Sequence, residues 1–278
     1  MEFKKVTLET IPHILRCTHL SDFSESNFTI GILLLWADEY DLYYYEEDDT
    51  MIFRGKSSHD HIYYSCPIGK NPRNILAQLP RPCTLMYVPE SKIGEFETSE
   101  KTLIPDDFDY VYSYQDLLGL HGKHKAYMRN HINRFLKDHP NHRYEKITLA
   151  HQEDLKKIIA GQTIKKPGRL DDDLHNLMAI DLYDKLPFIG GILYADDVPV
   201  AFSIGEVIGP MLYVNFEKRI DNVEGASDYN RWSFLKMYKD EKILTVNRED
   251  DAGDPGLRIS KQRMGPCCHI HKYRVELK

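Results

Sequence analysis

The two halves of this chain begin in the same way, and this repeat is the strongest constraint on its fold. The first half opens with Phe3-Lys4-Lys5-Val6-Thr7-Leu8 and an amphipathic stretch from Ile11 to Leu20. The second half repeats the pattern aromatic, any residue, Lys, aliphatic, Thr, Leu at Tyr144-Glu145-Lys146-Ile147-Thr148-Leu149, before an amphipathic stretch from His151 to Ala160. A repeat of about half the chain length favours two similar domains in tandem.

Strand-like and helix-like segments alternate along both halves. Runs of aromatic and β-branched residues between polar turns predict strands. Ala195-Asp196-Asp197 separates two such runs and predicts an antiparallel hairpin. A helix is predicted over Ser227–Lys239, with Ser227 as its N-cap. The pattern predicts an α/β fold with mixed sheets, whose strands are Phe28–Trp36, Thr50–Phe53, His61–Tyr64, Phe188–Tyr194, Val198–Val207, Met211–Phe216, Ile243–Val246 and Cys268–Leu277.

A helix within Gln115–His139 is expected to connect the two halves. Met128, Ile132 and Phe135 recur at the spacing of one helical face, and Pro140 ends the pattern. We therefore expect an N-terminal domain over residues 1–140, which includes the connecting helix, and a C-terminal domain over residues 141–278.

Two basic stretches stand out in a chain whose net charge is −7. The first basic island lies between Asp116 and Asp138, and it contains Lys123, Lys125, Arg129, Arg134 and Lys137 without any acidic residue. The second basic island lies between Asp254 and Glu276, and it contains Arg258, Lys261, Arg263, Lys272 and Arg274. Each island is either a solvated helix surface or a binding surface for an anion.

The second island carries the more specific signal. Asp254 is suited to be an N-cap and Pro255 to be the first helical residue, so a helix should begin there. The free N–H groups at a helix N-terminus hold phosphate or carboxylate. Gly253 and Gly256 keep the approach free of side chains, and Arg258 and Lys261 follow one turn later. This pattern predicts an anion-binding site.

Metal and membrane functions are not favoured by the sequence. In Cys267-Cys268-His269-Ile270-His271, alternate residues would share one face of a strand, with no loop to close a tetrahedral site, so we expect no metal. The N-terminus lacks the apolar segment of a signal peptide. The longest apolar run is far shorter than the roughly 20 residues that span a bilayer. We expect a cytoplasmic protein with reduced thiols.

Three segments resemble the cytosolic aminoacyltransferase domain of phosphatidylglycerol lysyltransferases and its stand-alone relatives. The first runs from Tyr114 through Gly122-Lys123 to Arg129-Asn130-His131-Ile132-Asn133-Arg134-Phe135. The second runs from Asn247-Arg248-Glu249-Asp250 through Gly256-Leu257-Arg258 to Pro266, and the third is Phe216-Glu217-Lys218. This resemblance implies a fold of two tandem N-acetyltransferase-like domains joined by a helix.

The resemblance also implies a reaction, the transfer of an aminoacyl group from charged tRNA to an acceptor. The acceptor is a lipid headgroup in the named members of the family. On this view the catalytic residues are Glu217, Asn247 and Asp250, which would contact the ammonium of the amino acid or handle the proton of the acceptor. The residues that would hold substrate or phosphate are Arg248, Gly253, Gly256, Arg258, Lys261, Lys123, Arg129, Asn130, Asn133 and Arg134.

Two departures from the family and its fold keep other functions open. The sequence contains no membrane-spanning region of the kind that delivers lipid, so the acceptor is either a lipid headgroup or a small amine or hydroxyl compound. The pyrophosphate loop of acetyl-CoA-dependent enzymes is missing, and Glu224-Gly225-Ala226-Ser227 lies in its place. The alternatives are an acyl-CoA-dependent N-acyltransferase and a non-catalytic module that binds nucleotide or tRNA.

Overall fold

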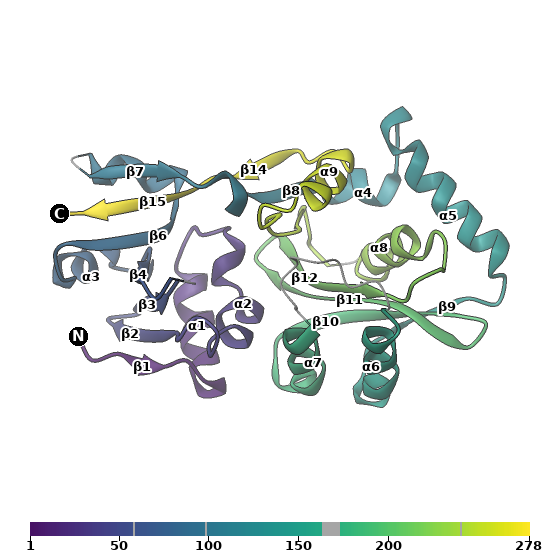
Figure 1. The fold of residues 1–278 in the computed structure, drawn as a ribbon, viewed down its shortest axis with the longest axis horizontal. Helices are drawn as coiled ribbons and strands as arrows, with labels where there is room; N and C mark the ends of the chain where they lie inside the picture. The colour runs from purple at the N-terminus through teal and green to yellow at the C-terminus, as the bar shows by residue number, and fades with distance from the viewer. Residues whose placement is uncertain (58, 98, 163–172, 240) are drawn as a thin grey trace. The chain divides into compact units, whose positions relative to one another are not determined.

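The chain folds into two units, each built around its own mixed sheet (Figure 1). The computed structural model describes residues 1–57, 59–97, 99–162, 173–239 and 241–278. Unit 1 comprises residues 1–110, 249–253 and 269–278, and unit 2 comprises residues 111–248 and 254–268. The expected boundary after residue 140 therefore falls inside unit 2.

Unit 1 contains a sheet of eight strands with the order β1-β2-β3-β4-β6-β15-β7, and β5 pairs with β3. Its strands pair antiparallel except for β4 and β6, which are parallel. The strands are β1 (Lys4–Lys5), β2 (Tyr43–Glu47), β3 (Thr50–Lys56), β4 (Ile62–Ser65), β5 (Ile68–Gly69), β6 (Cys83–Pro89), β7 (Glu100–Leu103) and β15 (Lys272–Leu277). The helices are α1 (Ile11–His19), α2 (Ile30–Leu35) and α3 (Pro72–Gln78).

The last strand of the chain completes the sheet of the first unit. β15 lies between β6 and β7, and its residue Val275 is fully buried against Ile52 and Leu85. Lys272, at the start of β15, is also fully buried, and its Nζ lies 2.6 Å from Oδ1 of Asp109. Ser26 donates two hydrogen bonds of 2.7 Å to the same carboxylate, from its backbone N–H and its hydroxyl. Unit 1 is thus closed by contacts among three segments that are far apart in the sequence.

Unit 2 contains a sheet of seven strands with the order β14-β8-β13-β12-β11-β10-β9. β10, β11 and β12 form an antiparallel meander, whereas β12 and β13 are parallel. The strands are β8 (Asp109–Ser113), β9 (Arg143–Lys146), β10 (Phe188–Ala195), β11 (Val198–Ile208), β12 (Met211–Arg219), β13 (Thr245–Asn247) and β14 (Cys268–Ile270). The chain passes from one unit to the other within β8, on either side of residues 249–253, and within β14.

The helices of unit 2 cover both faces of its sheet. α6 and α7 lie on one face, and α8 lies on the other (Figure 1). The helices are α4 (Tyr114–Gly119), α5 (Ala126–Asp138), α6 (Gln152–Ala160), α7 (Asp173–Asp181), α8 (Ala226–Met237) and α9 (Pro255–Arg263). Throughout the described part of the chain, no helix has the length and apolarity needed to cross a membrane.

The repeat of the sequence is a repeat of local structure. In unit 1, β1 leads through a 3-10 turn at Leu8–Thr10 into α1, and in unit 2, β9 leads through a 3-10 turn at Leu149–His151 into α6. Thr7 and Thr148 cap these turns with nearly the same backbone angles, φ −140° and −136°. The predicted α/β class with mixed sheets is confirmed, as is the hairpin between β10 and β11.

Three local predictions were wrong. The predicted strand Phe28–Trp36 contains α2, because Thr29 caps a helix there by accepting a hydrogen bond from the N–H of Ile32 at 3.3 Å. This helix is buried on nearly all sides, so its apolar run lacks the helical period. The connecting helix is two helices, α4 and α5, separated at Leu120, which has a left-handed backbone. The N-cap of α8 is Gly225 rather than Ser227.

The buried pair of Lys272 and Asp109 yields a prediction about stability. Burial lowers the pKa of Lys272, but attraction to Asp109 outweighs it and raises the pKa above its usual value. Lys272→Met would leave the Asp109 carboxylate buried without its counter-charge, and we expect a loss of about 3–5 kcal/mol in the free energy of unfolding. Urea denaturation measures this loss.

The matched control is Lys5→Met, which removes the Lys5–Asp38 pair, 3.3 Å apart and mostly exposed. This change should leave the urea midpoint nearly unchanged. Equal effects of the two substitutions would show that the buried pair contributes no more than a surface pair.

Candidate functional site

The candidate site lies where two parallel strands of unit 2 separate. β12 and β13 pair over only three residues, from Met211 opposite Thr245 to Tyr213 opposite Asn247. β12 continues to Arg219, whereas β13 ends at Asn247, and Arg248 follows directly. The Arg248 side chain reaches back to β12 and binds Glu217. An ion pair therefore bridges the point at which the two strands diverge.

Two arginines share the Glu217 carboxylate. Arg248 Nη2 and Arg231 Nε both contact its Oε2, the latter at 3.4 Å, while the Ser203 hydroxyl donates to Oε1 at 3.2 Å. Burial raises the pKa of Glu217, but attraction to Arg248 and Arg231 outweighs it and lowers the pKa to about 2. Glu217 is thus ionised at neutral pH, and a carboxylate of such low pKa is a poor general base.

The ion pair continues into a chain of polar contacts, called here the ionic chain. Arg231 Nη1 lies 3.1 Å from Asp228 Oδ1 on the same helix, α8. The other oxygen of Asp228 lies 2.6 Å from His131 Nδ1 on α5. The ionic chain of His131, Asp228, Arg231, Glu217 and Arg248 connects α5, α8, β12 and the end of β13. His131, Glu217 and Arg248 come from the three sequence segments that carried the family resemblance.

A small cavity adjoins the inner end of this ionic chain. It measures about 10 Å³, near the minimum for a single water molecule, and Glu217, Arg231 and Arg248 line its polar side. Val214, Val246 and other apolar side chains line the remainder. Arg248 Nε is buried and forms no hydrogen bond within the described part of the chain.

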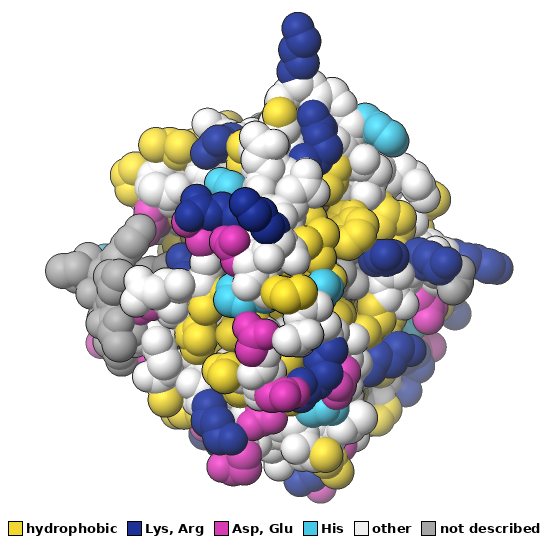
Figure 2. All heavy atoms as spheres, turned by 90° about the vertical axis from the view of Figure 1, so that its right-hand side faces the viewer, with side chains coloured by type: hydrophobic (Ala, Val, Ile, Leu, Met, Phe, Trp, Pro, Cys, Tyr) yellow, Lys and Arg dark blue, Asp and Glu magenta, His cyan; other side chains and the backbone are white. Residues whose placement is uncertain are grey.

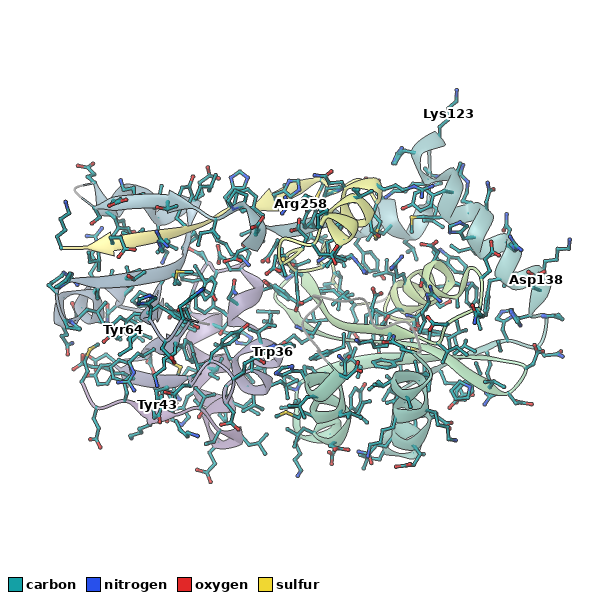
Figure 3. The ribbon with its side chains drawn as sticks, viewed as in Figure 1. Trp36, Tyr43, Tyr64, Lys123, Asp138 and Arg258 are labelled. Carbon is teal, nitrogen blue, oxygen red and sulfur yellow. The ribbon has the colours of Figure 1, made fainter. Side chains whose placement is uncertain are left out.

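Helix α9 starts as the sequence predicted and holds the backbone beside the ion pair. The Asp254 carboxylate accepts a hydrogen bond of 2.9 Å from the N–H of Leu257, and Pro255 is the first helical residue. Lys261 is mostly buried, and its Nζ donates to the carbonyl of Arg248 at 2.6 Å. Arg258 lies on the same helix (Figure 3). Lys261 therefore fixes the backbone of Arg248 while Glu217 fixes its side chain.

The structure brings some of the predicted site residues together and leaves others apart. Glu217, Arg248 and Lys261 are in contact within unit 2, and the fully buried Asn247 immediately precedes Arg248. Gly256 and Arg258 lie in the first part of α9. Asp250 and Gly253 belong to unit 1, where Asp250 accepts a hydrogen bond from the N–H of Ala252 at 3.0 Å.

Most cations of the first basic island make local contacts. Arg129 donates to the carbonyls of Leu120 and Gly122, and Arg134 pairs with Glu224 and Asp138. Lys125 is buried and donates to the Met264 carbonyl at the end of α9. Asn130 and Asn133 are exposed, as is Lys123, which points away from the turn before α5 (Figure 3).

The surface around α5 also indicates that the cations of the first island bind neighbouring groups of the protein. On the face that Figure 2 presents, Lys and Arg side chains alternate with acidic and apolar ones and do not form a continuous basic surface. The first island therefore serves mainly to hold α5 against α4, α8 and α9.

The sequence did not reveal several members of the site, namely Arg231, Asp228, Ser203 and Asn230. Asp228 and Arg231 are three residues apart on a predicted helix, so their own pairing could have been found. Their partners could not, because Glu217 precedes Arg231 by 14 residues and His131 precedes Asp228 by 97.

Helix α5 also covers the N-terminus of α8. Gly225 there has φ +80°, and a side chain added to it would collide with the carbonyl of His131. Phe135 of α5 stacks on Tyr229 of α8, with 4.8 Å between ring centroids.

Comparisons with known proteins place this geometry in a family. The family model described as phosphatidylglycerol lysyltransferase, C-terminal, matches residues 18–276. A conserved protein of unknown function from Bacteroides thetaiotaomicron is 25% identical, with a TM-score of 0.92 over 100% of both chains. No curated protein matches the sequence.

Two other solved structures share the fold at low identity. The C-terminal domain of a putative lysylphosphatidylglycerol synthetase from Agrobacterium fabrum is 11% identical, with a TM-score of 0.67 over 97% of this chain and 93% of that chain. FemX is 9% identical, with a TM-score of 0.64 over 99% of this chain and 97% of that chain.

The low pKa of Glu217 predicts a specific dependence of stability on pH. Since its pKa in the fold is below the usual value of 4.5, ionised Glu217 stabilises the protein above pH 4.5, and this contribution is lost as the pH falls toward about 2. Glu217→Gln should cost about 3–5 kcal/mol at pH 7, because two arginines lose their shared counter-charge. The difference from wild type should shrink below pH 4.5.

Urea denaturation of both proteins between pH 7 and pH 3 measures this difference. Glu224→Gln is the control, since Glu224 forms a half-exposed pair with Arg134, and it should have little effect at any pH. A Glu217→Gln difference that stays constant down to pH 3 would contradict the low pKa.

Proposed function

Because the chain belongs to the phosphatidylglycerol lysyltransferase C-terminal family, we propose that it transfers an aminoacyl group from charged tRNA to an amine or hydroxyl acceptor. The observation that carries this proposal is the Arg248 guanidinium, fixed by Glu217 and Lys261 where β12 and β13 separate. Two solved structures that share the fold, a putative lysylphosphatidylglycerol synthetase and L-PGS from Bacillus licheniformis, support the proposal. The acceptor is a lipid headgroup or a small amine or hydroxyl compound.

The proposed reaction is an attack on the ester carbonyl that links the amino acid to tRNA. The acceptor nitrogen or oxygen forms a bond to the carbonyl carbon, and the carbonyl oxygen becomes negatively charged. The ester C–O bond then breaks, and the proton of the acceptor goes to the departing ribose oxygen. A cationic hydrogen-bond donor held in place beside the negatively charged carbonyl oxygen lowers the barrier, because the donor does not have to reorganise during the reaction.

Arg248 is suited to this role, and Glu217 to a supporting one. With its oxygens bound to two arginines and a hydroxyl, Glu217 orients Arg248 instead of accepting a proton or an ammonium group. Asn247 and Asp250 keep their proposed roles, as contacts for the amino acid's ammonium or for the proton of the acceptor.

The phosphates of the donor would bind at the start of α9. Pro255 has no N–H and Asp254 caps that of Leu257, so the Gly256 N–H, the positive dipole end and Arg258 would supply the binding groups, while Lys261 holds the Arg248 carbonyl nearby. Gly253 and Gly256 would let a phosphate approach the backbone. Lys123, Arg129, Asn130, Asn133 and Arg134 would contribute at most secondary contacts, given the local partners of Arg129 and Arg134.

Acyl-CoA is the less favoured donor. The slot that a pyrophosphate loop would use precedes α8, and there Gly225 packs against the carbonyl of His131. A carbonyl oxygen repels a phosphate, and α5 would have to move to admit one. An acyl-CoA-dependent activity remains the second candidate, and a module that binds tRNA without turnover the third.

Arg258→Ala tests the site at α9. We expect this substitution to weaken the binding of charged tRNA on the order of tenfold, because a charge-assisted hydrogen bond is worth about 1.5–3 kcal/mol. The control is Arg263→Ala, at the other end of the helix, where the guanidinium stacks on Tyr127 at 3.8 Å from the ring centroid. Thermal-shift titration and a transfer assay with radiolabelled aminoacyl groups measure both effects.

The ligands distinguish the three candidate functions. Stabilisation by charged tRNA, together with release of the amino acid to an added amine, supports the proposal. Stabilisation by acyl-CoA alone would support the second candidate. Binding of tRNA without any transfer to a panel of amines, hydroxyl compounds and lipid headgroups would support the third. If the Arg258→Ala and Arg263→Ala variants bind charged tRNA with equal affinity, the N-terminus of α9 is not part of the binding site.

A further inference from the structure

Two side chains of α8 lie in the middle of the ionic chain and outside every segment that resembled the family. Asp228 and Arg231 connect Glu217 to His131, and each forms two ionic contacts. The Asp228 side chain is 8% exposed and that of Arg231 is 24% exposed. Partly buried charges that are fully paired restrict the geometry of their partners more than exposed pairs do.

Arg248, at the inner end of the ionic chain, has a buried N–H group, at Nε, without a hydrogen-bond partner among the described residues. Its Nη2 binds Glu217. Leaving a buried guanidinium N–H unsatisfied is costly, so such a group requires an explanation. The adjacent cavity of about 10 Å³ has room for one water molecule, and its charged lining side chains are Glu217, Arg231 and Arg248.

The orientation of Arg248 depends on groups beyond Glu217. If Glu217 were held only by Arg248, the pair could rotate together about the end of β12. Arg231 prevents this by binding the same oxygen, Oε2, at 3.4 Å, and Asp228 fixes Arg231 in turn at 3.1 Å. Ser203, which accepts from Asn230 Nδ2 at 2.7 Å, holds the other oxygen of Glu217.

We propose that Asp228 and Arg231 are positioning residues which, through Glu217, hold the Arg248 guanidinium with its Nε–H available to a single ligand oxygen. The identity of that oxygen, the carbonyl oxygen of the aminoacyl ester, rests on the proposed function. The geometry of the ionic chain is independent of the proposed function. The cavity has room for a water molecule at the same position when no ligand is bound.

The Nε–H resonance of Arg248 in a ¹H–¹⁵N NMR spectrum tests the positioning directly. Arg248→Lys assigns the signal by its loss. In the wild-type protein we expect a signal that exchanges slowly with solvent, since the group is buried. Asp228→Asn should accelerate this exchange at least tenfold, and Arg231→Lys, which keeps the charge without the planar fork, should do the same.

Asp138→Asn is the matched control, since it removes an exposed aspartate that lies 3.5 Å from Arg134 on α5. It should leave the Arg248 signal unchanged, and Asp228→Glu should restore slow exchange in part. Circular dichroism confirms that each variant is folded. An Nε–H signal in folded Asp228→Asn and Arg231→Lys proteins that matches the wild type would overturn the proposal.

Transfer kinetics separate this inference from the proposed function. If the protein transfers aminoacyl groups, Asp228→Asn should lower kcat on the order of 100-fold with less than a threefold change in KM, because the loss concerns the reacting oxygen. A rise in KM on the order of 100-fold at constant kcat would contradict the positioning role. Absence of transfer by the wild-type protein would refute the proposed function, while the NMR result would still decide the geometry.

Discussion

The carboxylate of Glu217 is the point on which the organisation of unit 2 depends. A buried carboxylate is costly unless cations and donors satisfy it, and here two guanidiniums and a hydroxyl do so. These partners come from the end of β13, from α8 and from β11, so one side chain fixes the relative positions of three elements. The early separation of β12 and β13 creates the space that the arginine side chains fill. The same interactions that hold the separated strands also determine where Arg248 can act.

Buried ionic contacts have the same structural role in unit 1. There, Asp109 joins Lys272 from the last strand to Ser26 from the first 110 residues, with distances of 2.6 to 2.7 Å. Apolar packing such as that of Val275 against Leu85 supplies area but tolerates small shifts in register. A charge pair inside the core tolerates them poorly, because a displaced partner leaves an uncompensated charge. In both units, therefore, segments distant in sequence meet at a specific ion pair.

The sequence predicted local features better than it predicted the contacts of the site. The amphipathic stretches after the repeated segments at Phe3 and Tyr144, the hairpin at Ala195 and the N-cap at Asp254 depend on nearby residues, and all of them are present. The helix α2 was missed because apolar residues surround it on nearly all sides, which removes the period that identifies a helix. The contacts that join Arg231 to Glu217 and Asp228 to His131 were missed because these partners are 14 and 97 residues apart. The basic character of the first island did not reveal that Arg129 and Arg134 would bind neighbouring carbonyl and carboxylate groups.

Helix α5 links the choice of donor to the geometry of the site. The backbone carbonyl of His131 in α5 contacts Gly225, the N-cap of α8, and the His131 imidazole binds Asp228 in the first turn of the same helix. Opening the N-terminus of α8 to a phosphate would therefore also disturb the ionic chain that orients Arg248. The contact that Lys125 makes with α9 lies at the opposite end of that helix, at the Met264 carbonyl. On the proposed function, a donor whose phosphates bind at the start of α9 leaves the contact between His131 and Asp228 in place, whereas a donor that requires the N-terminus of α8 displaces it.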